Sequence, residues 1–149
     1  FGVERIVAGL EALQKARLPV VPHIVCGIDY GRMRGEQNAL DIVAHFKIEQ
    51  VVILSLMGIP GTPVQRANPP RAEDVAELIA MARLRMPHTP ISLGCARTRG
   101  NDRLDVLAVD AGVNRMALPS DEAIERAQAY GLDIRYQKSC CSVPGDRAD

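Results

Sequence analysis

Strand-length apolar runs alternate with helical segments along the whole chain, and this alternation constrains the fold more than any other feature. The helical segments repeat apolar residues every three or four positions and carry their charges on other faces. Alternation of this kind predicts an α/β fold in which parallel strands are covered by helices. The predicted strands are Val20–Cys26, Val51–Leu56, Ile91–Leu93, Arg115–Leu118 and Leu132–Tyr136.

The ends of the helical segments carry the usual boundary residues. Ser120 has the side chain of an N-cap, and Gly112 and Gly131 follow two of the segments, as helix-ending glycines do. The first helix begins near Val3 and ends before Pro19, because proline interrupts a helix. The others are predicted at Glu36–Phe46, Glu73–Met86, Asp102–Ala111 and Ala123–Tyr130.

Five strands leave the architecture incomplete. A closed parallel barrel needs about eight, whereas an open doubly wound sheet is built from as few as five. The chain also begins with a helix that no strand precedes, and an uncovered first strand would expose an apolar edge. We therefore expect a partial TIM-type (β/α) barrel with outer helices whose earlier βα units lie outside this chain. Residues 1–138 form this half-barrel and residues 139–149 a flexible, cysteine-containing tail.

Composition excludes several classes of function. Eighteen basic residues balance eighteen acidic ones, so a general attraction to nucleic acid is not expected. No apolar run approaches the roughly 18 residues that cross a bilayer. The charges at Glu4, Glu11 and Lys15 exclude the apolar core of a signal peptide from Phe1–Ala16. We expect a cytoplasmic protein without membrane or nucleic-acid partners.

The segment ISLGCARTRG carries the strongest sign of chemistry. Cys95, Arg97 and Arg99 follow a strand, where parallel α/β proteins place their ligand-binding loops. Arginine holds carboxylates or phosphates through two bonds, and nearby guanidinium groups lower the pKa of a thiol. The alternative is a small buried thiol beside solvated arginines, and the sequence leaves both open.

Four cysteines in a chain without a secretion signal favour free thiols or metal ligands over disulfides. Cys26 lies within an apolar strand and is expected in the core. Cys140 and Cys141 are too close in sequence for the cysteine pair of a zinc finger, which has two to four residues between its cysteines. They belong either to a metal cluster that a distant cysteine completes or to a mobile tail.

Two glycine-rich loops follow predicted strands. Gly27, Gly31 and Gly35 precede Glu36 at a helix start, where free N–H groups and close backbone approach suit a small ligand. An ordinary βα turn is the alternative. The loop Gly58–Thr62 lies either against a ligand or across the surface as a rigid connection. Nucleotide-binding GxGxxG, P-loop, GxSxG and HExxH motifs do not occur.

Three blocks of sequence together resemble radical S-adenosylmethionine enzymes of the biotin synthase-like group. They match the later strands of that family's barrel in order and spacing, so the chain looks like its C-terminal half. The blocks are HIVCGIDYGRMRGEQNALDIV (His23–Val43), VVILSLMGIPGTP (Val51–Pro63) and ISLGCARTRGNDRLDVLAVDAGVNRMALPSDEAIERAQAYGL (Ile91–Leu132).

The resemblance implies S-adenosylmethionine bound across the carboxyl ends of the strands and, as a possibility shared with sulfur-inserting relatives, an auxiliary iron–sulfur cluster. It implies a small-molecule or carrier-bound substrate and an electron donor of the flavodoxin or ferredoxin type. Catalytic residues are not assigned. Cofactor contacts are expected at Ile24, Gly27, Gly35, Glu36 and Gly58, an anionic substrate group at Arg97 or Arg99, and auxiliary-cluster ligands at Cys95, Cys140 and Cys141.

Two features depart from the family's pattern. The CxxxCxxC motif that holds the [4Fe–4S] cluster does not occur in residues 1–149, so its ligands lie outside this chain. We therefore expect that the chain alone does not cleave S-adenosylmethionine reductively. Ser92 stands where biotin synthase has an arginine ligand of its auxiliary cluster. Alternatives are a relative that catalyses isomerisation or C–C chemistry, and a non-catalytic partial barrel whose partner supplies the missing strands.

Overall fold

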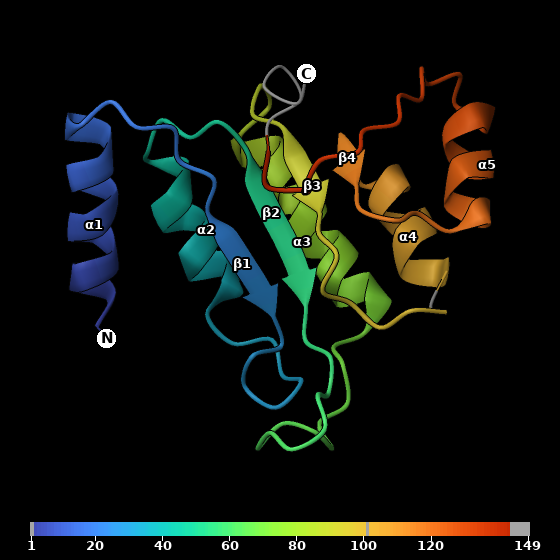
Figure 1. The fold of residues 1–149 in the computed structure, drawn as a ribbon, viewed down its shortest axis with the longest axis horizontal. Coiled ribbons are helices and arrows are strands. Elements are labelled where there is room, and N and C mark those ends of the chain that lie inside the picture. Colours follow the sequence, from blue (N-terminus) through green and yellow to red (C-terminus); the bar gives the residue numbers. More distant parts are fainter. Residues whose placement is uncertain (1, 101, 144–149) are drawn as a thin grey trace.

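The computed structural model describes residues 2–100 and 102–143 and shows helices and strands in alternation (Figure 1). All four strands are parallel and lie in the order β1-β2-β3-β4. The elements are α1 (Val3–Lys15), β1 (His23–Cys26), α2 (Glu36–Ala44), β2 (Val51–Ser55), α3 (Ala72–Arg85), β3 (Ile91–Leu93), α4 (Asp102–Asp110), β4 (Arg115–Met116) and α5 (Asp121–Ala129).

The strand order distinguishes the two architectures that the sequence left open. A doubly wound sheet reverses its strand order at a switch point, whereas each strand of a (β/α) barrel lies beside its neighbour in the chain. The sheet follows the second pattern, and Figure 1 shows α2 and α3 behind it. The predicted α/β fold of parallel βα repeats is confirmed, as an open sheet that fits a partial TIM-type barrel.

The predicted fifth strand is wrong. Residues 132–137 have no regular secondary structure, although their apolar and charged residues alternate as in a half-buried strand. Leu132 and Tyr136 are both more than half exposed, and Arg135 pairs with Asp133 in solvent. Strand preference depends on burial of one face, and here Ile134 is only half-buried while its neighbours on the same face stay exposed.

The core lies between the sheet and the helices. Alternate strand residues point toward α3, because side chains of a strand alternate between its two faces. Cys26 belongs to this core, as predicted, and burial raises the pKa of its thiol to about 12, with the Glu36 carboxylate adding to the shift. The buried residues from the strands are Ile24, Cys26, Val51, Ile53, Ile91 and Leu93, and those from α3 include Val75, Leu78, Ile79 and Ala82.

Helix α1 does not share in this core. Its apolar residues recur at the predicted spacing, but none of its residues is buried, and Val3 and Ile6 are more than half exposed. The helix lies at one side of the sheet, beyond α2 (Figure 1). An amphipathic helix gains most of its stability by packing its apolar face, so α1 has the form of a helix that packs against a further element.

Gly31 offers a direct test of how the loops are packed. Its φ of +87° is left-handed, and a Cβ there would lie 2.0 Å from the carbonyl oxygen of Asn68. We expect Gly31→Ala to lower the free energy of unfolding by about 2–3 kcal/mol, because both backbone strain and a clash with backbone oppose it. Urea denaturation measures the change.

Gly9→Ala is the matched control. Gly9 lies inside α1, and a Cβ there would meet nothing within 4 Å. Alanine is favoured over glycine in a helix by about 1 kcal/mol, so this variant should be as stable as wild type or more so. Equal effects of the two substitutions would contradict the described packing of Gly31 against Asn68.

Candidate functional site

Three loops that follow strands meet at one edge of the sheet. Gly35 follows β1, Met57 follows β2 and Cys95 follows β3, and the three strands are parallel and paired in sequence. The carboxyl ends of these strands therefore share an edge, the lower one in Figure 1. This is the edge at which α/β proteins bind their ligands.

The first of these loops is closed by Glu36, the first residue of α2. Its buried carboxylate accepts a hydrogen bond of 2.8 Å from the backbone N–H of Gly27. A carboxylate in the first turn is also stabilised by the helix dipole. Gly35, with a φ of +88°, is the N-cap, and a Cβ there would meet nothing within 4 Å. Gly35 and Glu36 are thus held at the rim of a surface cavity of about 370 Å³.

That cavity lies between α2 and α3. Its lining is mixed in character, with Met33 and Met81 beside the carboxylates of Asp74 and Glu77. Of the five residues predicted to bind the cofactor, only Gly35 and Glu36 line it.

The remaining three predicted cofactor contacts have other neighbours. A Cβ at Gly27 would lie 2.8 Å from Pro70, and one at Gly58 would lie 2.5 Å from the carbonyl oxygen of Gln65. Ile24 is buried in the helix-side core. These glycines allow close packing of the chain against its own proline-rich loop, which is the turn-forming alternative that the sequence left open. Their contact with a cofactor stays a prediction.

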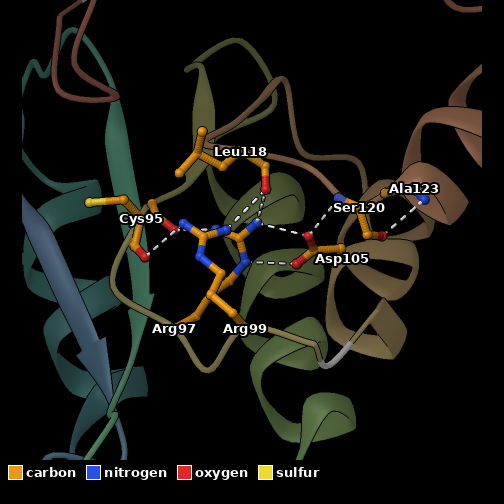
Figure 2. Close-up of polar contacts among 8 residues, drawn as sticks. Cys95, Arg97, Arg99, Asp105, Leu118, Ser120 and Ala123 are labelled. Atoms are coloured by element: carbon orange, nitrogen blue, oxygen red, sulfur yellow. Dashed lines mark hydrogen bonds and ion pairs between the residues drawn. The ribbon is translucent and has the colours of Figure 1, made fainter. Parts of the chain in front are cut away.

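The loop that follows β3 is organised by a buried ion pair (Figure 2). Arg97 is 1% exposed, and its guanidinium binds Asp105 through Nε at 2.7 Å and Nη2 at 2.8 Å. The Nη1 atom donates to the carbonyl oxygen of Gly94 at 2.6 Å. Asp105 also accepts from the backbone N–H of Ser120, whose hydroxyl caps α5 by accepting from Ala123 N–H. Arg97 therefore connects β3, α4 and the start of α5.

Arg99 differs from Arg97 in its exposure. Its Nη1 donates to the carbonyl oxygen of Leu118 at 3.0 Å and its Nη2 to that of Cys95 at 3.2 Å, yet the residue stays exposed (Figure 2). Both arginines line a hollow of about 190 Å³, together with Asp102 and Asp105. Since Arg97 is committed to Asp105, Arg99 is the arginine of the pair that is accessible to an anionic ligand.

The structure brings the Cys141 thiol beside the backbone of Cys95. Burial raises the pKa of the Cys141 thiol, a hydrogen bond with the Cys95 backbone opposes this, and the charges of Cys140 and Cys95 raise it further. A hydrogen bond with the Ser142 hydroxyl lowers the pKa of the exposed Cys140 thiol. Within residues 2–100 and 102–143, no group of three His, Cys, Asp or Glu side chains is placed to hold a metal ion. The auxiliary cluster stays a prediction.

Of the predicted tail, residues 139–149, the structure describes residues 139–143, and residues 144–149 lie outside the described residues. Its described part contacts Gln50 and Arg115, two residues that sequence reasoning missed. Each had a signal, because Arg115 is a charged residue at the start of an apolar strand and Gln50 directly precedes another. None of the described helices is long and apolar enough to cross a membrane.

The Arg97–Asp105 pair should contribute strongly to stability. We expect Arg97→Met to lower the free energy of unfolding by about 3–5 kcal/mol, because it leaves the Asp105 charge buried without its partner. The double variant Arg97→Met/Asp105→Leu should lose less than the single one, since no unpaired charge remains. Urea denaturation of both variants measures this.

Arg135→Met is the control for that experiment. Arg135 forms an ion pair of 2.9 Å with Asp133, but the two side chains are 86% and 73% exposed. Exposed pairs contribute about 0–1 kcal/mol, so this variant should unfold nearly as wild type does. A loss for Arg97→Met no larger than this would show that the pair is not the organiser of its loop.

Comparisons with known proteins identify the family. The model of the Biotin and Thiamin Synthesis associated domain matches residues 36–136. Biotin synthase of Ruthia magnifica subsp. Calyptogena magnifica is 28% identical over 107 residues, which cover 70% of this chain and 33% of that protein. Biotin synthase of Halorhodospira halophila is 30% identical over 100 residues, which cover 64% and 31%. The chain thus spans about a third of the length of these relatives.

Among solved structures, the tryptophan synthase alpha chain from Legionella pneumophila subsp. pneumophila is similar with a TM-score of 0.49 and 21% identity. The similarity covers 86% of this chain and 55% of that one. The family model, by contrast, spans most of the sequence, from the start of α2 to beyond α5. The chain belongs to the Biotin and Thiamin Synthesis associated domain family, in agreement with its predicted place among biotin synthase-like proteins.

Proposed function

We propose that this chain forms the C-terminal portion of a radical S-adenosylmethionine enzyme that resembles biotin synthase. The observation that carries the proposal is the meeting of three βα loops at one edge of a sequentially wound parallel sheet, in a chain of this family. The protein's part in such chemistry is to position and shield the reactants. The described residues supply one wall of such a site.

S-adenosylmethionine would supply the radical, and the ligands of its [4Fe–4S] cluster lie outside this chain. Gly35 suits a nearby ligand, because the space at its missing side chain is open. Glu36 holds the turn in place through the Gly27 N–H, at the N-terminus of α2. These residues would seat the cofactor through backbone groups and leave the Glu36 carboxylate in its structural bond.

Arg99 would hold an anionic group of the substrate. Two backbone carbonyl oxygens orient its guanidinium, and Arg97 fixes the loop beneath it. An arginine held in this way loses less conformational entropy when it binds a carboxylate. In the finer form of the proposal the reaction is sulfur insertion, and Cys95, Cys140 and Cys141 bind an auxiliary cluster after the tail rearranges.

A second candidate is a non-catalytic partial barrel that needs a partner. The exposed apolar face of α1 favours it, because such a face fits a partner that supplies further βα units. The coding region upstream of Phe1 separates the two candidates. An in-frame CxxxCxxC supports the enzyme, and a start codon adjacent to Phe1 supports the subunit.

Reductive cleavage of S-adenosylmethionine tests the enzymatic proposal. The test uses a joined polypeptide, in which the upstream βα units with an in-frame CxxxCxxC motif precede this chain. It should release deoxyadenosine from S-adenosylmethionine when a reduced flavodoxin supplies electrons. The chain alone, reconstituted with iron and sulfide under the same conditions, should release none. The joined polypeptide would contradict the proposal if it bound its cluster, shown by the absorption of the iron–sulfur unit, and still left the cofactor intact.

Biotin provides a probe of Arg99, because the relatives' name indicates it as a product and it carries a carboxylate. We expect Arg99→Gln in the joined polypeptide to weaken biotin binding about tenfold, the effect of one charge-assisted hydrogen bond. The neutral amide of biotin should bind wild type and variant equally. Arg103→Gln is the control, since Arg103 is an exposed arginine paired with Glu73. Calorimetric titration that finds Arg99→Gln and Arg103→Gln alike would exclude Arg99.

A further inference from the structure

The segment 137–143, here called the inner plug, returns from α5 to the sheet. It has no regular secondary structure, and Figure 1 shows its dark red trace passing near the starts of β2 and β3. This is the edge opposite to the βα loops. A segment without secondary structure of its own needs other groups to satisfy its backbone.

Side chains at the starts of three strands form hydrogen bonds with backbone and side-chain groups of the inner plug. Gln50 donates from Nε2 to the carbonyl oxygen of Cys141 at 2.6 Å, and Arg115 donates from Nη1 to the carbonyl oxygen of Val143. Arg115 also donates from Nη2 to the side-chain oxygen of Gln137, and its Nη1 binds the side-chain oxygen of Gln50 at 2.9 Å. At β1, the His23 ring lies 3.2 Å from the Ser142 hydroxyl. Arg115 and Gln50 thus act together as a clasp.

These contacts place the inner plug on the face of the sheet opposite to the helices. Arg115 is the register partner of Ser92, and Ser92 is the partner of Val52. Val52 and Ser92 alternate with residues of the helix-side core, so their side chains point to the other face. Both are nonetheless 0% exposed. An open four-stranded sheet has no second layer of its own there, so the contacts of Arg115 and Gln50 point to the inner plug as their cover.

The cover is imperfect in its polar contacts. The hydroxyls of Ser92 and Ser139 are buried and have no hydrogen-bond partner among the described residues. A buried hydroxyl without a hydrogen-bond partner destabilises the covered state, because on exposure the hydroxyl would form hydrogen bonds with water. A few hydrogen bonds at its margin therefore hold the inner plug in place. The unpaired hydroxyls of Ser92, on the sheet, and Ser139, in the plug, favour its release.

The inner plug also reaches along the sheet toward the opposite edge. Cys141, whose carbonyl group binds Gln50 at the start of β2, has its thiol beside the backbone of Cys95 beyond the end of β3. The hydrogen bonds of the plug with Gln50, Arg115 and His23 nevertheless all lie at the strand starts.

We propose that the inner plug is a removable cover of the inner face of the sheet, clasped by Arg115 and Gln50. The proposal does not depend on the proposed function. The plug itself follows from the contacts of Arg115, Gln50 and Ser92. Its release leaves the helix-side core intact, because none of its residues belongs to that core.

Ser92→Cys places a nearly isosteric thiol beneath the inner plug and reports its departure. In the full chain, N-ethylmaleimide should label this thiol slowly. Deletion of residues 137–149 should raise the labelling rate at position 92 at least about tenfold, because local protection is lost with the cover. Arg115→Met, which opens the clasp at full length, should raise it as well. Peptide-resolved mass spectrometry reads each cysteine separately.

Cys26 is the internal control, because it is fully buried on the helix side. It should stay unlabelled in all of these chains. Equal labelling of position 92 with and without residues 137–149 would show that the inner plug does not cover Ser92. Labelling of Cys26 after the deletion would show that the segment is part of the fold and not a removable cover. Arg135→Met should leave every rate unchanged, because Arg135 and its ion-pair partner Asp133 both lie outside the plug.

Discussion

The buried ion pair of Arg97 and Asp105 is the interaction on which the last part of the fold, from β3 to α5, depends. One guanidinium joins the end of β3 to α4, and one carboxylate joins α4 to the start of α5. β4 is only two residues long and, within residues 2–100 and 102–143, pairs with β3 alone, so few backbone bonds hold this strand. A charged pair removed from water is specific in its geometry, because any other arrangement would leave a charge buried alone.

This pair also explains why the two arginines of one loop differ. Arg97 points inward and its guanidinium forms an ion pair with Asp105, whereas Arg99 lies two residues further on and stays at the surface. The loop thus resembles a functional site in which one residue positions and another remains available for a ligand. A sequence that shows two arginines and a cysteine after a strand cannot say which arginine is buried, since that depends on a carboxylate from the next helix.

The sequence predicted the parts of the fold that periodicity determines. The boundaries of β1 to β4 and of α1 to α5 lie within three residues of the predicted ones, because apolar spacing reports which face is buried. The predicted fifth strand, Leu132–Tyr136, is wrong because its apolar residues alternate correctly but Leu132 and Tyr136 are not buried by packing. Likewise, the glycine loop after β1 was consistent with a ligand or a turn, and only the position of Asn68 and Pro70 against it favours the turn.

The two faces of the sheet are completed in different ways. The helix-side face is closed by apolar packing that the chain provides for itself, with Leu78 and Ile79 of α3 fully or nearly fully buried. In our proposal the inner face lies under an irregular segment that a few hydrogen bonds hold at the strand starts. Apolar packing is lost only when the fold is lost, whereas a few hydrogen bonds exchange readily with water or a ligand. The cover of the inner face can therefore be lost while the helix-side core stays folded.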